Sequence, residues 1–357
     1  MEAERNQQNP SEAPTGEVLL STDCGPLLGL DNGRCREFRG VPFARAERFA
    51  YAQPVTRWDG VLDARRFGPG CPQNRAVHEH PEHPTRRFYK REYREGLELR
   101  YDEDCLNLNI YAPYRAEKAP VILFFFGGGF DSGLNCEGAF DGSALAEQGV
   151  VTVFANYRVG VLGYLTHAEM KARYGREGNL GLDDQLTALR WLRDHVSDFG
   201  GDPENITLMG QSAGAISVQY LCLNPANKGL FRRAIMLSGA GKFPKFALPR
   251  PAEQTRAYWA EFMAAAGCRS FDELSRRAAL PALRRRGALS GDPEGQHLQH
   301  HAGDRRPVDP GAGGAPGPQP PAPGLSHRLY QRGHVRPRHG LDRQPLWPKD
   351  RGLDLSL

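Results

Sequence analysis

The fold is decided by the stretch Ile206-Thr207-Leu208-Met209-Gly210-Gln211-Ser212-Ala213-Gly214-Ala215-Ile216-Ser217-Val218. An apolar run of β type ends at Gly210, a serine lies between two glycines, and a run of small residues typical of a helix follows at once. A serine in a sharp strand-to-helix turn needs neighbours without side-chain bulk, and Gly210 and Gly214 supply that room. The pattern G-x-S-x-G is typical of a nucleophile elbow, so Ser212 is the predicted nucleophile; the alternative is an ordinary strand-to-helix turn.

Regular elements surround this stretch. Residues 121–126 and 150–155 are continuous apolar runs, as central parallel strands require, whereas residues 106–111 alternate like a half-buried strand. A hairpin turn is predicted at Asp31-Asn32-Gly33 and a further strand over residues 231–238. Helical spacing predicts helices over residues 182–199, 252–267 and 271–280. Strands that alternate with helices predict an α/β fold, a mostly parallel sheet with helices on both faces.

Composition and charge exclude several classes of protein. The 357 residues carry a net charge of +4, but residues 281–357 hold 12 Lys and Arg against 7 Asp and Glu. The basic character therefore belongs to the C-terminal tail, and we expect no nucleic-acid partner. The basic, aromatic stretch over residues 86–94 is better explained as a solvated helix or loop than as a nucleic-acid patch.

Targeting and metal signals are equally weak. We expect no membrane partner and a cytoplasmic location, because no apolar run nears 18 residues and no signal-peptide pattern begins the chain. The seven cysteines show neither C-x-x-C nor metal-site spacing, so no metal and no cofactor are predicted. The oligomeric state is left open.

The chain divides into three parts. Residues 1–14 are polar and expected to be disordered, and residues 15–282 form the body. Residues 283–357 form a low-complexity tail: residues 281–340 contain 11 Gly and 10 Pro but no Phe or Ile. Such a segment buries too little apolar surface to offset the entropy of ordering it, so disorder is predicted there.

A second glycine-rich stretch fits the elbow. Gly127-Gly128-Gly129-Phe130 follows a predicted central strand, and residues without Cβ leave their backbone N–H groups free to bind an oxyanion. Gly128 and Gly129, with the N–H of Ala213, are the predicted oxyanion hole; the alternative is an ordinary glycine-rich loop.

These motifs, in this order and spacing, resemble the type-B carboxylesterase/cholinesterase family of α/β-hydrolases, especially its bacterial members. The resemblance covers roughly residues 15–282 and includes the segments 38–44, 103–109, 127–130, 156–158, 179–185, 199–203 and 210–214. It implies an α/β-hydrolase fold, incomplete at its C-terminus, that hydrolyses small-molecule carboxylic esters through an acyl-enzyme.

This sequence departs from the family pattern at two positions near the predicted site. Phe126 stands where the family usually has His before the glycines, which removes a polar support of the oxyanion loop. Gln211 replaces the usual Glu before the nucleophile, which removes a partly buried charge. Cys71 and Cys105 match the positions of a disulfide in secreted relatives, but with no secretion signal we expect thiols.

The catalytic acid and base are not found in this chain. The family order is Ser, then Asp or Glu, then His, and the resemblance places the base beyond residue 357 and the acid within the tail, where no matching motif stands. His167 and His195 precede Ser212 and are interpreted as residues of a helix surface or loop.

One hypothesis explains the missing groups. Read one nucleotide later with suitable codons, residues 300–307 encode Ile-Thr-Pro-Val-Ile-Asp-Gly, which resembles a family segment. Residues 327–335 then encode Ile-Gly-Ser-Thr-Ser-Glu-Asp-Met, which resembles the segment with the catalytic acid. The tail is therefore either disordered or a frameshifted translation of an esterase gene.

Three functions are considered for this chain. The first is a serine carboxylesterase, weakly active or inactive without its acid and base. The second is a non-catalytic remnant that acts at most as a binding protein. The third, an adhesion-type member, normally lacks the nucleophile, so the presence of Ser212 argues against it. A body that stops short of the complete fold is also expected to expose a sheet edge and to dissolve poorly.

Overall fold

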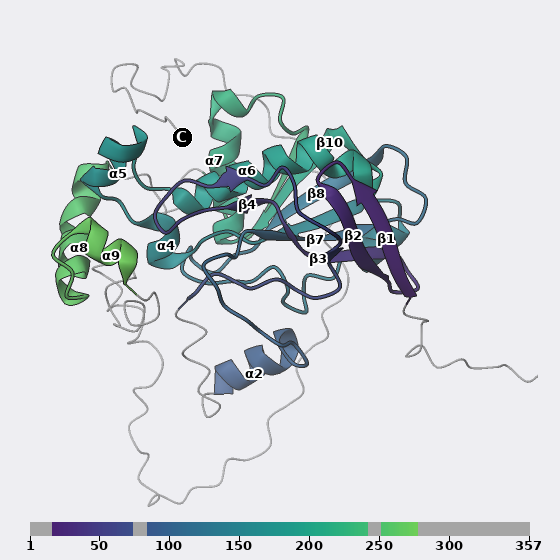
Figure 1. Ribbon diagram of the computed structural model, residues 1–357, viewed down its shortest axis with the longest axis horizontal. Coiled ribbons are helices and arrows are strands. Elements are labelled where there is room, and N and C mark those ends of the chain that lie inside the picture. The colour runs from purple at the N-terminus through teal and green to yellow at the C-terminus, as the bar shows by residue number, and fades with distance from the viewer. Residues whose placement is uncertain (1–15, 74–83, 242–250, 278–357) are drawn as a thin grey trace, which may run out of the picture. The chain divides into compact units, whose positions relative to one another are not determined.

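A computed structural model of the chain describes residues 16–73, 84–241 and 251–277 (Figure 1). In these ranges a central sheet of nine strands has the order β1-β2-β3-β7-β9-β8-β10-β11, and β6 pairs with β2. Its strands are β1 (Gly16–Thr22), β2 (Gly25–Asp31), β3 (Arg36–Pro42), β6 (Leu62–Asp63), β7 (Asn107–Ala112), β8 (Ala119–Phe125), β9 (Val151–Ala155), β10 (Gly201–Gln211) and β11 (Arg233–Leu237). A separate pair is formed by β4 (Ala44–Arg45) and β5 (Gln53–Pro54).

Helices fill the connections between these strands. The α-helices are α2 (Pro84–Tyr93), α3 (Ser143–Glu147), α4 (Gly160–Tyr164), α5 (Ala168–Tyr174), α6 (Leu180–His195), α7 (Ala213–Leu223), α8 (Ala252–Ala265) and α9 (Phe271–Arg276). Two short 3₁₀ helices, η1 (Val196–Phe199) and η2 (Pro225–Asn227), follow α6 and α7. Helices α3, α6 and α7 pack against the sheet, so the predicted α/β class is confirmed.

The sheet is mixed, and its parallel part carries the elbow. Strands β9, β8, β10 and β11 run parallel, whereas β1, β2, β3, β7 and β9 pair antiparallel in turn. The predicted apolar runs are β8 and β9, and every residue of β9 is buried, as a strand with both faces covered requires. The predicted hairpin between β2 and β3 is also present, with Gly33 at φ 78°.

Strand β7 corrects one expectation. Residues 106–111 alternate in polarity, yet all of β7 is buried. Its asparagines are satisfied by neighbouring loops: Asn107 donates to the Pro69 carbonyl at 2.9 Å and Asn109 to the Asn135 carbonyl at 3.0 Å. A polar face can therefore be buried here, because side-chain hydrogen bonds replace water.

Helix boundaries differ modestly from the prediction. The helix expected over residues 182–199 is α6 followed by η1, and α8 and α9 end earlier than expected within residues 252–267 and 271–280. The basic stretch 86–94 lies mostly in α2, as the helix interpretation predicts. Arg94 is not solvated, however: it is 5% exposed and pairs with the buried Glu137 at 3.0 Å.

Strand β11 forms one edge of the sheet within the described residues. It pairs parallel with β10, and all five of its residues are exposed, including Ile235, Met236 and Leu237. This agrees with the exposed sheet edge expected from the sequence. The predicted disordered segments 1–14 and 283–357 lie outside the described residues.

Candidate active site

Ser212 lies in a sharp turn between β10 and α7. Its backbone has φ 54° and ψ −119°, a conformation that side-chain-bearing residues rarely adopt. Two hydrogen bonds hold it: the Ser212 N–H donates to the Leu237 carbonyl at 2.8 Å, and the Ser212 carbonyl accepts from the Ile216 N–H at 3.1 Å. The half-buried serine thus stands at the N-terminus of an 11-residue helix, where the helix dipole favours negative charge.

The two glycines of the elbow are required by close backbone contacts. A Cβ added to Gly210 would lie 2.3 Å from the Gly214 carbonyl oxygen. A Cβ added to Gly214 would lie 2.1 Å from the Phe125 carbonyl oxygen, at the end of β8. These contacts explain why G-x-S-x-G is needed: α7 begins almost in contact with the backbone of β8 and β10.

The glycine loop after β8 lies directly beside Ser212. A Cβ added to Gly127 would come within 2.9 Å of the Ser212 Cβ. Gly128, Gly129 and Phe130 all have positive φ, at 123°, 66° and 64°. The structure therefore brings together the two stretches that the sequence singles out, which are about 80 residues apart.

Hydrogen bonds orient the peptide between Gly128 and Gly129. The Gly128 carbonyl accepts from the N–H groups of Asp131 at 3.1 Å and Ser132 at 3.2 Å. Because the C=O and N–H of a trans peptide point in opposite directions, the Gly129 N–H is directed away from these bonds. In the part of the chain that is described, the N–H groups of Gly128 and Gly129 donate to no protein acceptor. The N–H of Ala213 belongs to the first turn of α7, where no intrahelical acceptor exists.

Phe126 supports this loop by packing rather than by polar contact. Its ring stacks on Tyr157 with 4.3 Å between centroids, and the Tyr157 hydroxyl donates to the Phe126 carbonyl at 2.7 Å. Tyr157 is a supporting residue that sequence reasoning missed, although it lies within the quoted segment 156–158. Gln211, which replaces the usual Glu of the family, is exposed.

The two described histidines make their contacts with residues other than Ser212. His167 caps α5 by accepting from the Glu169 N–H at 3.2 Å, and its ring stacks on Phe271. His195 contacts the Cys24 sulfur at 3.6 Å and is half-buried, so it is more enclosed than the predicted surface residue. Within the described residues, neither histidine forms a hydrogen bond to Ser212.

The seven cysteines are all free, in agreement with the expectation for Cys71 and Cys105. A hydrogen bond with Cys71, together with complete burial, raises the pKa of Cys105 well above its usual value. The Cys105 side chain therefore remains a protonated thiol at neutral pH.

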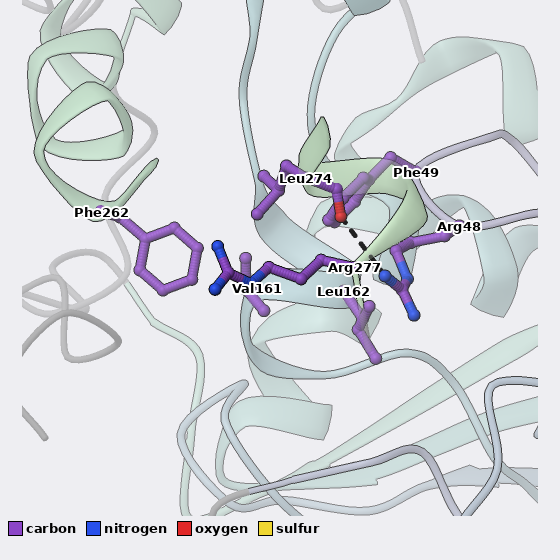
Figure 2. A pocket seen from close by; sticks show the side chains of 7 residues that line it. All are labelled: Arg48, Phe49, Val161, Leu162, Phe262, Leu274 and Arg277. Atoms are coloured by element: carbon purple, nitrogen blue, oxygen red, sulfur yellow. Dashed lines mark hydrogen bonds between the residues drawn. The ribbon is translucent and has the colours of Figure 1, made fainter. Parts of the chain in front are cut away.

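A small cavity lies elsewhere, among α4, α8 and α9 (Figure 2). Its lining is Arg48, Phe49, Val161, Leu162, Phe262, Leu274 and Arg277. Arg48 pairs with Glu103 and donates to the Leu274 carbonyl at 3.3 Å, so its charge is already compensated. None of these residues belongs to the elbow or to the glycine loop.

Comparison with known proteins decides the family. A family model described as the carboxylesterase family matches residues 16–288. The chain belongs to this family. The resemblance predicted from the motifs is thereby confirmed.

Individual family members match with substantial identity. The para-nitrobenzyl esterase of Bacillus subtilis is 39% identical over 231 residues, which are 63% of this chain and 44% of the relative. The fumonisin B1 esterase of Sphingopyxis macrogoltabida is 37% identical over 231 residues, 62% of this chain and 40% of the relative. A crystal structure of a Geobacillus stearothermophilus carboxylesterase superposes with a TM-score of 0.63 at 35% identity, covering 77% of this chain and 53% of that one.

The chain thus spans about half the length of the relatives it matches. The solved carboxylesterases confirm the α/β-hydrolase fold for the described part. None of the helices in the described ranges combines the length and apolar character that crossing a bilayer requires.

Proposed function

We propose that this chain carries the nucleophile half of a carboxylic ester hydrolase. The observation that supports this most strongly is the strained backbone of Ser212 beside the glycine loop, with 2.9 Å between the Ser212 Cβ and a Cβ built on Gly127. Strain of this kind costs of order 1–3 kcal/mol and persists where the surrounding structure enforces it, which is typical of catalytic nucleophiles.

The proposed reaction is acyl transfer. The Ser212 Oγ attacks the carbonyl carbon of a small carboxylic ester, and the N–H groups of Gly128, Gly129 and Ala213 bind the oxyanion that forms. Loss of the alcohol leaves an acyl-enzyme, which water then hydrolyses to the acid and free Ser212. The chemistry needs no cofactor.

We propose that the general base and its acid are not among the described residues. We propose that the 357-residue polypeptide alone turns over esters slowly or not at all. Removal of a triad base costs roughly 10⁶ in kcat, and what remains comes from oxyanion binding and substrate positioning. We propose that the esterase-like body ends near residue 282, so that it contains the nucleophile and the oxyanion hole but not the general base and its acid.

The test compares two polypeptides with a p-nitrophenyl ester. One is the 357-residue chain, and the other has the neighbouring reading frame restored after residue 282. We expect only the restored chain to be active, with Ser212→Ala reducing it to background. Ser217→Ala is the matched control, because this buried serine on α7 bonds only the Ala213 carbonyl, at 3.2 Å. Comparable activity of the two polypeptides would refute the proposal that the 357-residue chain lacks its general base. An active Ser212→Ala variant would refute the proposal that Ser212 is the nucleophile.

A non-catalytic binding protein is the second candidate. It is favoured by one observation: both described histidines are engaged in other contacts. If the protein is a non-catalytic binding protein, the frame-restored polypeptide should be folded but should not hydrolyse the p-nitrophenyl ester. Sequencing the genomic DNA tests the frameshift directly, since the absence of an esterase-like sequence in the neighbouring frame would exclude it.

A further inference from the structure

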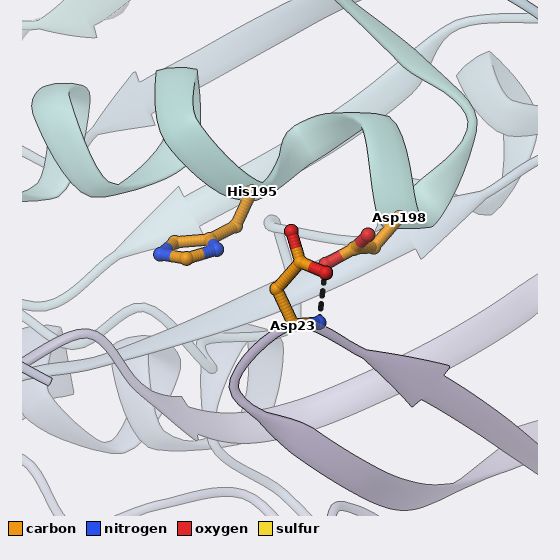
Figure 3. Close-up of side chains that lie close together, drawn as sticks. All are labelled: Asp23, His195 and Asp198. Atoms are coloured by element: carbon orange, nitrogen blue, oxygen red, sulfur yellow. Dashed lines mark hydrogen bonds between the residues drawn. The ribbon is translucent and has the colours of Figure 1, made fainter. Parts of the chain in front are cut away.

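We propose that Asp23, His195 and Asp198 form a binding site for a divalent transition-metal ion, with Zn²⁺ as the best fit. One ligand atom from each side chain lies within 4.8 Å of the other two. Figure 3 shows the three side chains converging from two elements. Asp23 lies in the turn between β1 and β2, whereas His195 and Asp198 lie at the end of α6 and in η1.

The backbone already holds these groups together. The Asp23 N–H donates to the Asp198 Oδ2 at 3.2 Å, which joins the hairpin turn to η1. The His195 ring packs on Trp191 with 4.7 Å between centroids, and its Nε2 lies 3.6 Å from the sulfur of the buried Cys24. The imidazole is therefore held between Trp191 and Cys24, with one ring nitrogen within 4.8 Å of a carboxylate oxygen of each aspartate.

The ligand set suits a metal cation. Asp23 and Asp198 place two carboxylates beside the His195 imidazole. Carboxylate oxygen and imidazole nitrogen are groups that divalent transition metals bind in proteins.

The ligand chemistry selects the metal. Mg²⁺ and Ca²⁺ prefer oxygen ligands alone, whereas Zn²⁺ binds imidazole nitrogen and carboxylate oxygen together at about 2.0–2.2 Å. Ligand atoms around tetrahedral zinc then lie about 3.4 Å apart, so separations of up to 4.8 Å must close by up to about 1.4 Å. The exposed Asp23 side chain can supply most of that movement, and water would complete the coordination.

A bound zinc ion would link the turn between β1 and β2 to the segment that leads into β10. His195 and Asp198 precede β10 whereas Ser212 follows it, so the length of this strand separates them from the candidate active site. We therefore expect zinc to raise stability rather than to take part in ester hydrolysis. The inference is independent of the proposed function.

The test is zinc binding to the full chain, measured by calorimetry after chelator treatment, with thermal unfolding in parallel. The chain has 11 histidines, so the result depends on a difference between variants. We expect His195→Gln and Asp198→Asn each to lose one equivalent of zinc, or to bind it at least tenfold more weakly, and to lose the zinc-induced rise in Tm. His167→Gln is the matched control and should behave as the wild type. Mg²⁺ and Ca²⁺ should not compete.

Asp23→Asn provides the variant least able to disturb folding, because this side chain is exposed. It should show the same loss of zinc. Unchanged zinc stoichiometry and affinity in the Asp23 and Asp198 variants, or no rise in Tm of the wild type with zinc, would overturn the proposal.

Discussion

The buried ion pair between Arg158 and Asp184 gives the sharpest prediction about stability. The Arg158 Nε donates to Asp184 Oδ2 at 2.9 Å and a terminal nitrogen donates to Oδ1 at 2.7 Å. The Arg158 backbone N–H adds a third bond at 3.0 Å, and the guanidinium also donates to the Ala50 carbonyl at 2.7 Å. The two side chains are 5% and 0% exposed. Asp184→Asn therefore leaves a buried guanidinium without its counter-charge.

The expected loss is about 3–5 kcal/mol in the free energy of unfolding, since removing one partner of a buried pair exposes the full desolvation penalty of the other. For a folded unit of this size, that corresponds to a Tm lower by roughly 6–20 °C. Urea denaturation followed by circular dichroism measures it. Replacing both partners, Arg158→Met with Asp184→Leu, should recover most of the loss, because no uncompensated charge then remains.

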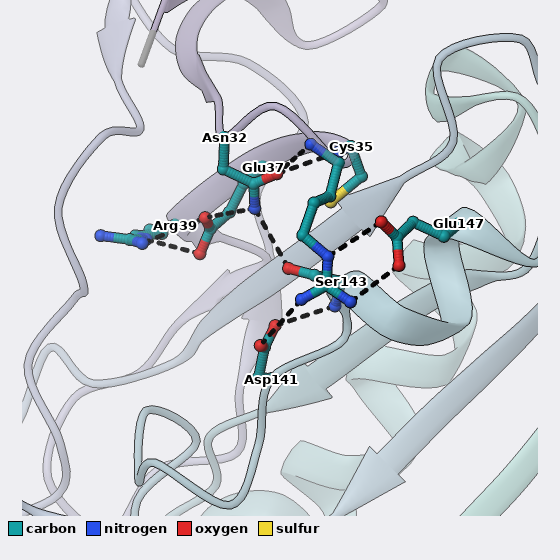
Figure 4. A network of polar contacts seen from close by, with 8 residues as sticks. Asn32, Cys35, Glu37, Arg39, Asp141, Ser143 and Glu147 are labelled. Carbon is teal, nitrogen blue, oxygen red and sulfur yellow. Dashed lines mark hydrogen bonds and ion pairs between the residues drawn. The ribbon is translucent and has the colours of Figure 1, made fainter. Parts of the chain in front are cut away.

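An exposed pair supplies the control. Arg34 pairs with Glu147 at 2.7 Å, beside the polar network around Asn32 and Ser143 (Figure 4), and both side chains are about 40% exposed. Glu147→Gln should cost less than about 1 kcal/mol, because solvent screens the pair. If Asp184→Asn lowers the free energy of unfolding by no more than Glu147→Gln does, burial does not make the Arg158–Asp184 pair more important for stability than the exposed pair.

Three further predictions concern packing, pH and thiol reactivity. Gly214→Ala should lower the free energy of unfolding by at least about 1–3 kcal/mol, because its Cβ would lie 2.1 Å from the Phe125 carbonyl oxygen. Gly16→Ala is the control in urea denaturation, since its Cβ would make only an ordinary contact at 3.5 Å. Burial raises the pKa of Tyr51 to about 12, so its contribution to stability is complete below pH 10 and is lost as the pH rises towards 12. Tyr51→Phe should therefore weaken the alkaline fall in stability, and an unchanged pH profile of unfolding would contradict this. A thiol reagent should modify the exposed Cys222 rapidly and all seven cysteines only after denaturation; fast reaction of a second thiol in the native chain would be inconsistent with the structure.

The parts of the fold that could be predicted from the sequence are those with local causes. Strands β8 and β9 are apolar throughout because both faces are covered, and that pattern is visible in each segment alone. The elbow could be predicted because the glycines that leave room for the turn at Ser212 lie two residues away on either side.

The parts that could not be predicted depend on partners remote in sequence. Burial of the β7 asparagines rests on acceptors such as the Pro69 carbonyl, 38 residues away. The cluster around His195 depends on Asp23, whose N–H bonds a residue 175 positions later in the chain. No pattern within one segment could have indicated that contact.

The backbone strain at Ser212 has a consequence for which residue selection for stability alone would place there. Glycine is the residue that adopts positive φ without steric penalty, so a glycine at this position would relieve strain of order 1–3 kcal/mol. Random mutation selected only for thermal stability should therefore favour loss of the serine. Retention of serine at 212 is a feature that selection for folding alone does not maintain.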